Sequence, residues 1–100
     1  MTKDIVRFKE FFGDEYPPLM SLISSHEDIY KKIIVEHLKS GTQIAESPGR
    51  VVDIITGEPI RIPLSMLSDG VYSWRSDMIY YYEKYNLKLN QDFVDHVLKM

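Results

Sequence analysis

The feature that most constrains the fold is the stretch from Ser68 to Tyr85, which holds the only tryptophan and five of the seven tyrosines. It opens with a turn at Ser68-Asp69-Gly70 and continues with alternating side chains, Tyr72 and Trp74 on one side. The spacing then becomes helical, with one stripe formed by Met78, Tyr81, Tyr82 and Tyr85. We therefore expect a strand that leads directly into a helix, with its aromatic side chains buried where a sheet meets the C-terminal helices.

The same aromatic side chains could instead form a stacking platform for single-stranded nucleic acid. Such platforms come with a basic groove, and only Arg75 and Lys84 lie among these aromatics. The net charge of −3 also argues against nucleic-acid binding, because neutralising phosphates requires a basic surface. Packing, or a share in a protein interface, is therefore the preferred interpretation.

The composition indicates one globular domain spanning residues 1–100, since 100 residues suffice for a single core but not for two. The chain has no cysteine, so neither disulfides nor thiolate metal sites can hold it together, as suits a reducing cytoplasm. We find no signal peptide and no apolar run long enough to cross a membrane. These observations predict a cytoplasmic protein.

Helical patterns recur in the two halves of the chain. The best signal is a capping box formed by Ser24 and Glu27, followed by an apolar face that includes Ile29 and Ile33 and extends to about Lys39. Gly41 can take the left-handed conformation that ends a helix. The other expected helices are Asp4–Phe12, one or two turns at Leu19–Ile23, and two C-terminal helices at Ser76–Tyr85 and Asn90–Leu98.

Between these helices the pattern indicates a β-meander. The expected strands are Gln43–Glu46, Arg50–Ile55, Ile60–Ile62 and Tyr72–Trp74, with Leu64–Leu67 able to pair into the same sheet. Turns are expected at Ser47-Pro48-Gly49, at Thr56–Pro59 and at Ser68-Asp69-Gly70. The sequence therefore predicts an α+β fold, in which three to four antiparallel strands pack with about four helices.

No residue pattern indicates a catalytic, cofactor or metal site. His26, His37 and His96 are far apart, without metal-ligand spacing, and the apolar position of His37 favours a hydrogen-bonded histidine at the core or its boundary. No serine lies in a nucleophile elbow, and the glycines do not form a phosphate-binding loop. We therefore expect no enzymatic activity and no cofactor.

A share of the aromatic stretch in a protein interface stays open, and the excess of acids allows a basic partner without requiring one. Candidates for such contacts are the acids in the first loops, at the start of the main helix and in the meander. Two residues of the aromatic stretch join them. The residues expected to bind a partner are Asp14, Glu15, Glu27, Asp28, Glu46, Asp53, Glu58, Tyr72 and Arg75.

Several segments together resemble a known group. They are Ile29–Lys39 followed by Ser40-Gly41-Thr42, the meander with Asp53, Ser68–Trp74, Asp77–Tyr85 and Phe93–Val97. In this succession the chain looks like small bacterial proteins encoded beside polymorphic toxins. It resembles the immunity proteins of enterobacterial contact-dependent growth inhibition systems over most of its length, through a packing motif and not a catalytic signature.

The resemblance implies a non-enzymatic protein that captures the C-terminal toxin domain of an effector and occludes its active site. Such toxins are commonly nucleases acting on tRNA, and an RNase of the EndoU type is the preferred partner. The alternative is a regulatory or scaffold module unrelated to toxins, with a small enzyme as a more distant third. An upstream reading frame that ends in a toxin-like domain would favour the first interpretation.

Overall fold

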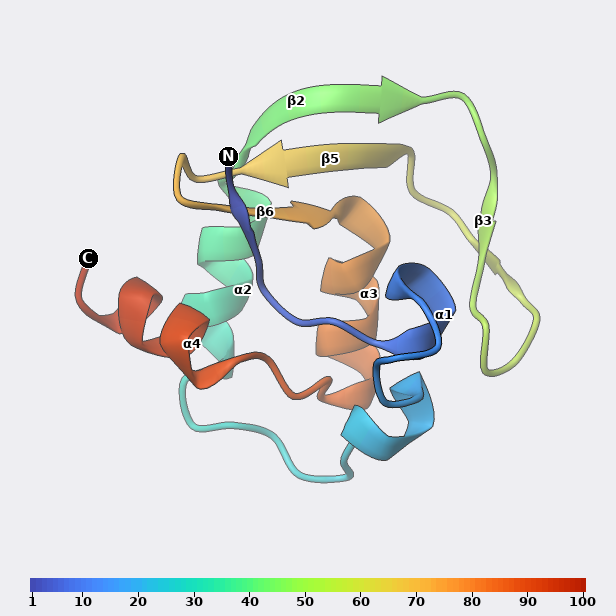
Figure 1. The fold of residues 1–100 in the computed structure, drawn as a ribbon, viewed down its shortest axis with the longest axis horizontal. Coiled ribbons are helices and arrows are strands. Elements are labelled where there is room, and N and C mark those ends of the chain that lie inside the picture. The colour runs from blue at the N-terminus through green and yellow to red at the C-terminus, as the bar shows by residue number, and fades with distance from the viewer.

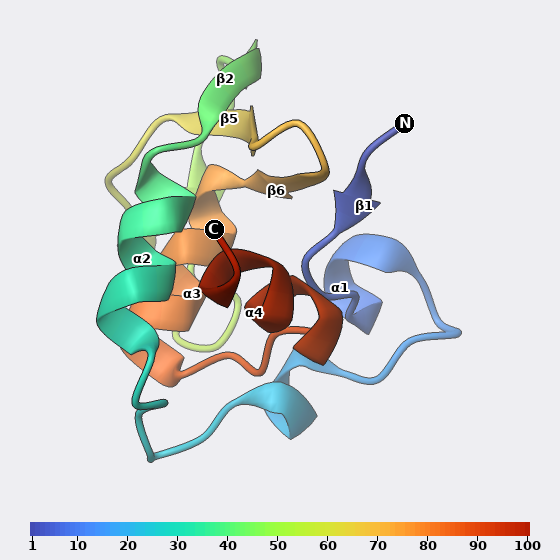
Figure 2. The same cartoon turned by 90° about the vertical axis from the view of Figure 1, so that its left-hand side faces the viewer.

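The computed structural model describes residues 1–100 and confirms an α+β fold. A four-stranded sheet has the order β1 (Lys3–Asp4), β6 (Tyr72–Arg75), β5 (Leu64–Ser68) and β2 (Thr42–Ser47). Three helices lie on one side of this sheet (Figures 1 and 2): α2 (Lys31–Lys39), α3 (Ser76–Tyr85) and α4 (Gln91–Leu98). None of the helices combines the length and apolar character that a membrane span requires.

The expected joint between strand and helix is confirmed, since β6 ends at Arg75 and α3 begins at Ser76. Trp74 is 1% exposed, and its indole Nε1 donates a hydrogen bond to the Leu38 carbonyl of α2 at 3.2 Å. Its ring lies 5.9 Å from that of Phe93 on α4. Trp74 therefore connects the sheet to two helices, and its burial is as the sequence predicted.

The C-terminal helices also follow the sequence pattern. Asn86 takes the left-handed conformation that ends α3, with φ 55°, and Asn90 precedes α4 as expected. Ser76 has a different role from the expected helix cap, because its hydroxyl donates to the Pro63 carbonyl and accepts from the Ser65 amide. Its side chain thus ties α3 to the β5 strand.

The predicted helix over Asp4–Phe12 is wrong in its first half. Only α1 (Lys9–Phe12) is helical, and the segment before it is extended, with β1 pairing in parallel with β6. The Lys3 amide donates to the Val71 carbonyl, and the Ile5 carbonyl accepts from the Asn90 amide. These tertiary hydrogen bonds outweigh a short local helical pattern, because isolated helices of this length are marginal.

The start of the main helix also differs from its prediction. The capping box does not form, because the Ser24 hydroxyl accepts from the His26 amide and the helix begins only at Lys31. Two residues expected in the core, Ile29 and Ile33, are 86% and 51% exposed. Residues 19–22 form a single 3₁₀ turn between α1 and this region.

Gly41 does not take the left-handed conformation that was expected to end the main helix, since its φ is not among the positive values of the chain; α2 ends at Lys39, with Ser40 as its C-cap. A Cβ atom at Gly41 would lie 2.7 Å from Cζ2 of Trp74, well inside van der Waals contact. Glycine is therefore needed here because the buried indole packs directly on the backbone.

The predicted meander is only partly correct. β5 pairs antiparallel with both β2 and β6, but β1 makes the sheet mixed. The expected strand Arg50–Ile55 shortens to β3 (Val51–Val52), which pairs with β4 (Pro59–Ile60) in a separate ribbon. This ribbon lies beyond the ends of β2 and β5 (Figure 1). β3 ends at Val52 because the next residue, Asp53, starts a turn with its own side chain.

Candidate functional site

Most residues expected to bind a partner are exposed but spread over several segments. Asp14 and Glu15 lie in the loop after α1, and Glu27 and Asp28 precede α2. Two more exposed acids lie elsewhere, Glu46 on β2 and Glu58 in the turn of the β3–β4 ribbon. These six acids thus come from four separate segments of the chain.

Asp53 is not available to a partner, which corrects its place among the exposed candidates. It is fully buried, and its Oδ1 accepts hydrogen bonds from the Ile55 and Thr56 amides. The hydroxyls of Tyr80 and Tyr85 both donate to Oδ2. Burial works against ionisation, but these four hydrogen bonds outweigh it and lower the pKa of Asp53 to about 2.

Tyr72 and Arg75 are likewise occupied within the protein. Tyr72 is 5% exposed and packs against Phe93 of α4 at 5.0 Å between ring centroids. The half-buried Arg75 guanidinium lies 3.8 Å from the centre of the Phe11 ring and forms a bidentate pair with Asp77, at 3.1 and 2.8 Å. Burial nevertheless raises the pKa of Asp77, against the effect of Arg75. Both candidates therefore contribute to packing inside the protein, and only Arg75 keeps part of its side chain exposed, at 32%.

A surface at the start of α2 unites two of the predicted acids with unexpected apolar side chains. We call Ile29, Tyr30 and Ile33 the α2 patch; they are 86%, 39% and 51% exposed. Exposed carboxylates flank it in the sequence, at Glu27, Asp28 and Glu36. The helical periodicity of the sequence placed Ile29 and Ile33 in the core. In the structure Ile29 precedes α2, and α2 buries Ile34 and Leu38, which leaves Ile33 exposed.

A hollow of about 320 Å³ adjoins the start of α2 and is bordered by Glu27, Asp28 and Tyr82. The buried Tyr82 hydroxyl has no hydrogen-bond partner, which leaves one polar group unsatisfied there. Burial raises the pKa of Tyr82 to about 12, so the hydroxyl keeps its proton. The hydroxyl itself is buried, so its unsatisfied hydrogen-bonding capacity lies inside the fold and not in the hollow.

Another group of convergent titratable side chains lies at His37, Asp69 and His96. Nε2 of His37 on α2 and Nε2 of His96 on α4 lie 2.7 and 2.8 Å from the same oxygen, Oδ2 of Asp69, in the β5–β6 turn. The other oxygen, Oδ1, accepts from the Val71 and Tyr72 amides. Burial opposes ionisation of Asp69, but these hydrogen bonds together lower its pKa to about 2.

This cluster confirms the prediction of a hydrogen-bonded boundary histidine at position 37, but sequence analysis missed its partners. The two histidines are separated from Asp69 by 32 and 27 residues, so no local spacing connects them. The one available signal was Asp-Gly in a hairpin turn, which places the aspartate carboxylate over the following amides. A hollow of about 430 Å³ adjoins the cluster, bordered by His37, Asp69 and Gly70.

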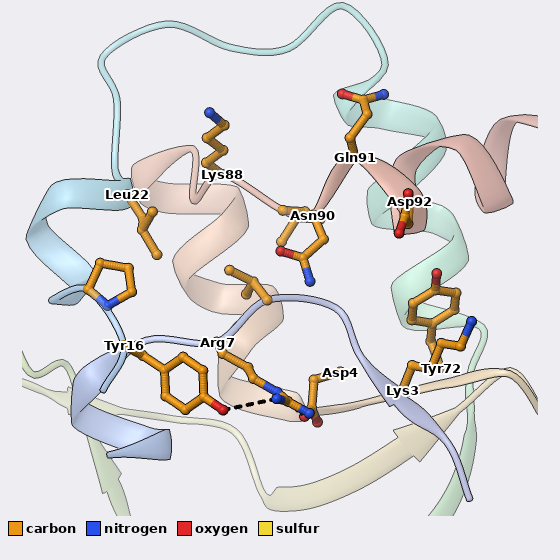
Figure 3. A pocket seen from close by; sticks show the side chains of 13 residues that line it. Lys3, Asp4, Arg7, Tyr16, Leu22, Tyr72, Lys88, Asn90, Gln91 and Asp92 are labelled. Atoms are coloured by element: carbon orange, nitrogen blue, oxygen red, sulfur yellow. Dashed lines mark hydrogen bonds and ion pairs between the residues drawn. The ribbon is translucent and has the colours of Figure 1, made fainter. Parts of the chain in front are cut away.

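Figure 3 shows another hollow, of about 580 Å³, between the N-terminal segment and the connection from α3 to α4. Arg7 extends between Asp4 and Tyr16, donating to them at 2.8 and 2.9 Å, and these contacts raise its pKa. Lys88 and Asp92 stand on its far wall. Because charges of both signs border this hollow, it does not offer the uniformly basic surface that a phosphate group requires.

Comparisons of the chain with protein-family models, with characterised proteins and with solved structures found no match.

Proposed function

We propose that the protein is an immunity protein that binds the C-terminal toxin domain of a contact-dependent growth inhibition effector and occludes its active site. The observation that carries the proposal is the α2 patch, where three large apolar side chains are exposed beside carboxylates. The resemblance of the sequence to such immunity proteins supports the same function. The protein would then act in the cytoplasm, without catalysing a reaction.

The chemistry of the α2 patch matches the anatomy of protein interfaces. Interface centres are enriched in apolar and aromatic side chains, and a polar rim surrounds them. A contiguous exposed apolar surface rimmed by polar residues is also a recognised mark of an interaction site. Ile29, Tyr30 and Ile33 would supply such a centre, and Glu27, Asp28 and Glu36 its rim.

The rim suits a partner with a basic surface. A nuclease must hold phosphate groups, so its active site is electropositive, and carboxylates facing it would increase both association rate and complementarity. The net charge of −3 has the sign that this partner requires. An RNase domain, with the EndoU type preferred, is therefore the proposed toxin.

The proposal is tested with the C-terminal domain encoded by the reading frame immediately upstream. Co-expression should protect cells from that domain, and the two chains should purify together as a complex. Lack of protection, with no complex at micromolar concentration, would refute the proposal. In that case a regulatory or scaffold module becomes the preferred function.

Two variants test whether the α2 patch is the contact surface. Ile33→Glu should weaken binding about 30-fold, as expected for an apolar residue at an interface centre. Ile44→Glu is the matched control, because Ile44 is 57% exposed but lies on β2. If Ile44→Glu weakens binding and Ile33→Glu does not, the interface lies on the sheet edge and not on α2.

Charge reversal tests the acidic rim. Glu27→Lys should weaken binding more at low than at high salt, because screening already reduces the interaction at high salt. Asp14→Lys and Glu15→Lys, in the loop after α1, show whether that loop shares the contact. If all three variants bind at low salt with the affinity of the unsubstituted protein, these three acids do not lie on the binding surface.

A further inference from the structure

We propose that His37, Asp69 and His96 form a binding site for a divalent first-row transition metal, with Zn²⁺ the favoured ion. This inference is independent of the proposed function and concerns the opposite end of α2 from the α2 patch. Three separate segments supply the ligand atoms: α2, the β5–β6 turn and α4.

The ligand set has the chemistry of a zinc site. One atom from each residue, two imidazole nitrogens and one carboxylate oxygen, lies within 4.8 Å of the others. Nitrogen and oxygen ligands of this kind suit Zn²⁺, and two histidines with one carboxylate are an established set for zinc that keeps an open position. Three protein ligands leave a fourth position for water.

The distances require only a small adjustment. In a tetrahedral zinc site, with bonds of about 2.0–2.2 Å, neighbouring ligand atoms lie about 3.4 Å apart. The two Nε2 atoms are at 2.7 and 2.8 Å from Oδ2, so each imidazole would move outward by roughly 0.6 Å. The metal would take the place of hydrogen at both Nε2 atoms. A neutral imidazole that is coordinated through Nε2 carries its proton on Nδ1.

The carboxylate is already held in place for such a role. The Val71 and Tyr72 amides donate to Oδ1 of Asp69 at 2.9 and 2.7 Å, which fixes the direction of Oδ2. Outer hydrogen bonds of this type orient metal ligands and tune their affinity. The site therefore has its outer contacts to the carboxylate before any ion binds.

The site is also accessible. The side chains of His37 and His96 are 11% and 23% exposed, and the hollow of about 430 Å³ opens beside His37 and Asp69. An ion can thus enter from solvent without unfolding of α2 or α4. Once bound, it would link both helices to the β5–β6 turn and would stabilise the folded state by mass action.

The test is a titration of EDTA-treated, dialysed protein with ZnCl₂, followed by thermal unfolding. At free Zn²⁺ about 100-fold above Kd, Tm should rise by about 10 °C. Mg²⁺, which prefers oxygen ligands in octahedral geometry, should not change Tm. Co²⁺ gives a second readout, because tetrahedral nitrogen and oxygen coordination produces visible absorption.

Matched variants locate the effect. His96→Gln should fold, since His96 is partly exposed, and should lose at least tenfold in Zn²⁺ affinity together with the Co²⁺ absorption. His26→Gln is the control, because His26 is exposed in the loop before α2. No Zn²⁺-dependent rise in Tm at millimolar Zn²⁺ would overturn the proposal. An equal rise in His96→Gln, or its loss in His26→Gln, would also overturn it.

Discussion

Asp53 and Asp69 are held by the same arrangement of hydrogen bonds in two different parts of the molecule. In each, Oδ1 accepts from the backbone amides two and three residues later in the chain. In each, Oδ2 meets two side-chain groups from helices. Both carboxylates have a pKa of about 2, because the hydrogen bonds outweigh burial.

The two sites differ in the side chains that meet Oδ2. Tyr80 and Tyr85, both on α3, supply hydroxyls to Asp53, and the hydrogen bond to Asp53 raises the pKa of Tyr85 to about 12. The Tyr85 hydroxyl therefore keeps its proton near neutral pH. His37 and His96 instead present ring nitrogens that can bind a metal. The same turn geometry therefore makes a structural anchor at Asp53 and a candidate binding site at Asp69.

The largest expected effect is the loss of the structural anchor. Asp53→Ala should reduce the free energy of unfolding by about 3–5 kcal/mol, because it leaves two hydroxyls and two amides without their acceptor in a buried site. Asp69→Ala should cost less, about 2–3 kcal/mol, since His37 and His96 can reach solvent. Urea denaturation at neutral pH measures both. An equal or larger loss of stability in Asp69→Ala would contradict the assignment of Asp53 as the stronger structural anchor.

The next effect is a loss of stability in acid. The folded pKa of Asp53, about 2, lies below its ordinary value of 3.8, so its stabilisation is complete above the ordinary value. It is lost as the pH falls toward 2, by up to about 2 kcal/mol. Asp53→Asn, which cannot titrate, should lack this contribution. Unfolding curves collected from pH 6 to pH 2 should converge for the two proteins; a constant difference between them would contradict the assignment.

The smallest effects compare single donors at the two sites. Tyr85→Phe removes one hydroxyl from Asp53 and should cost about 1–1.5 kcal/mol. His96→Gln, measured without metal, should cost less than about 1 kcal/mol, because His96 is partly exposed and glutamine can still donate. Thermal unfolding at neutral pH resolves the difference. If His96→Gln loses more stability than Tyr85→Phe, the main role of the Asp69 cluster is to stabilise the fold.

Several elements were predictable from the sequence because their signals are local. The strand that leads into α3, the turn at Asp69-Gly70 and the stop at Asn86 each depend on a few neighbouring residues. Gly70, with φ 96°, occupies a conformation that glycine tolerates best. The burial of Trp74 followed from the same stretch, since it is the chain's only tryptophan among clustered tyrosines.

The candidate sites were not predictable in the same way. The prediction of where α2 starts was wrong because the end of α3 holds the loop before it. The Ser24 amide donates to the Tyr85 carbonyl, and the Asn86 side chain donates to the Ser24 carbonyl. With the loop held in this way, Ile29 lies outside the helix, and α2 buries Ile34 and Leu38 in place of Ile33. Tertiary hydrogen bonds of this kind override a capping pattern that is worth only about 1 kcal/mol.

Local signals in the chain were therefore sufficient for the α+β class, the turn chemistry of Asp69 and the helices after Trp74. Which groups meet each aspartate, and which apolar side chains remain exposed, depends on how the elements pack. The difference follows from separation along the sequence, because turns and periodicity depend on residues that are only a few positions apart. The contacts of His37 and His96 with Asp69 join residues that are 32 and 27 positions apart. Such contacts form when α2, α4 and the β5–β6 turn pack together.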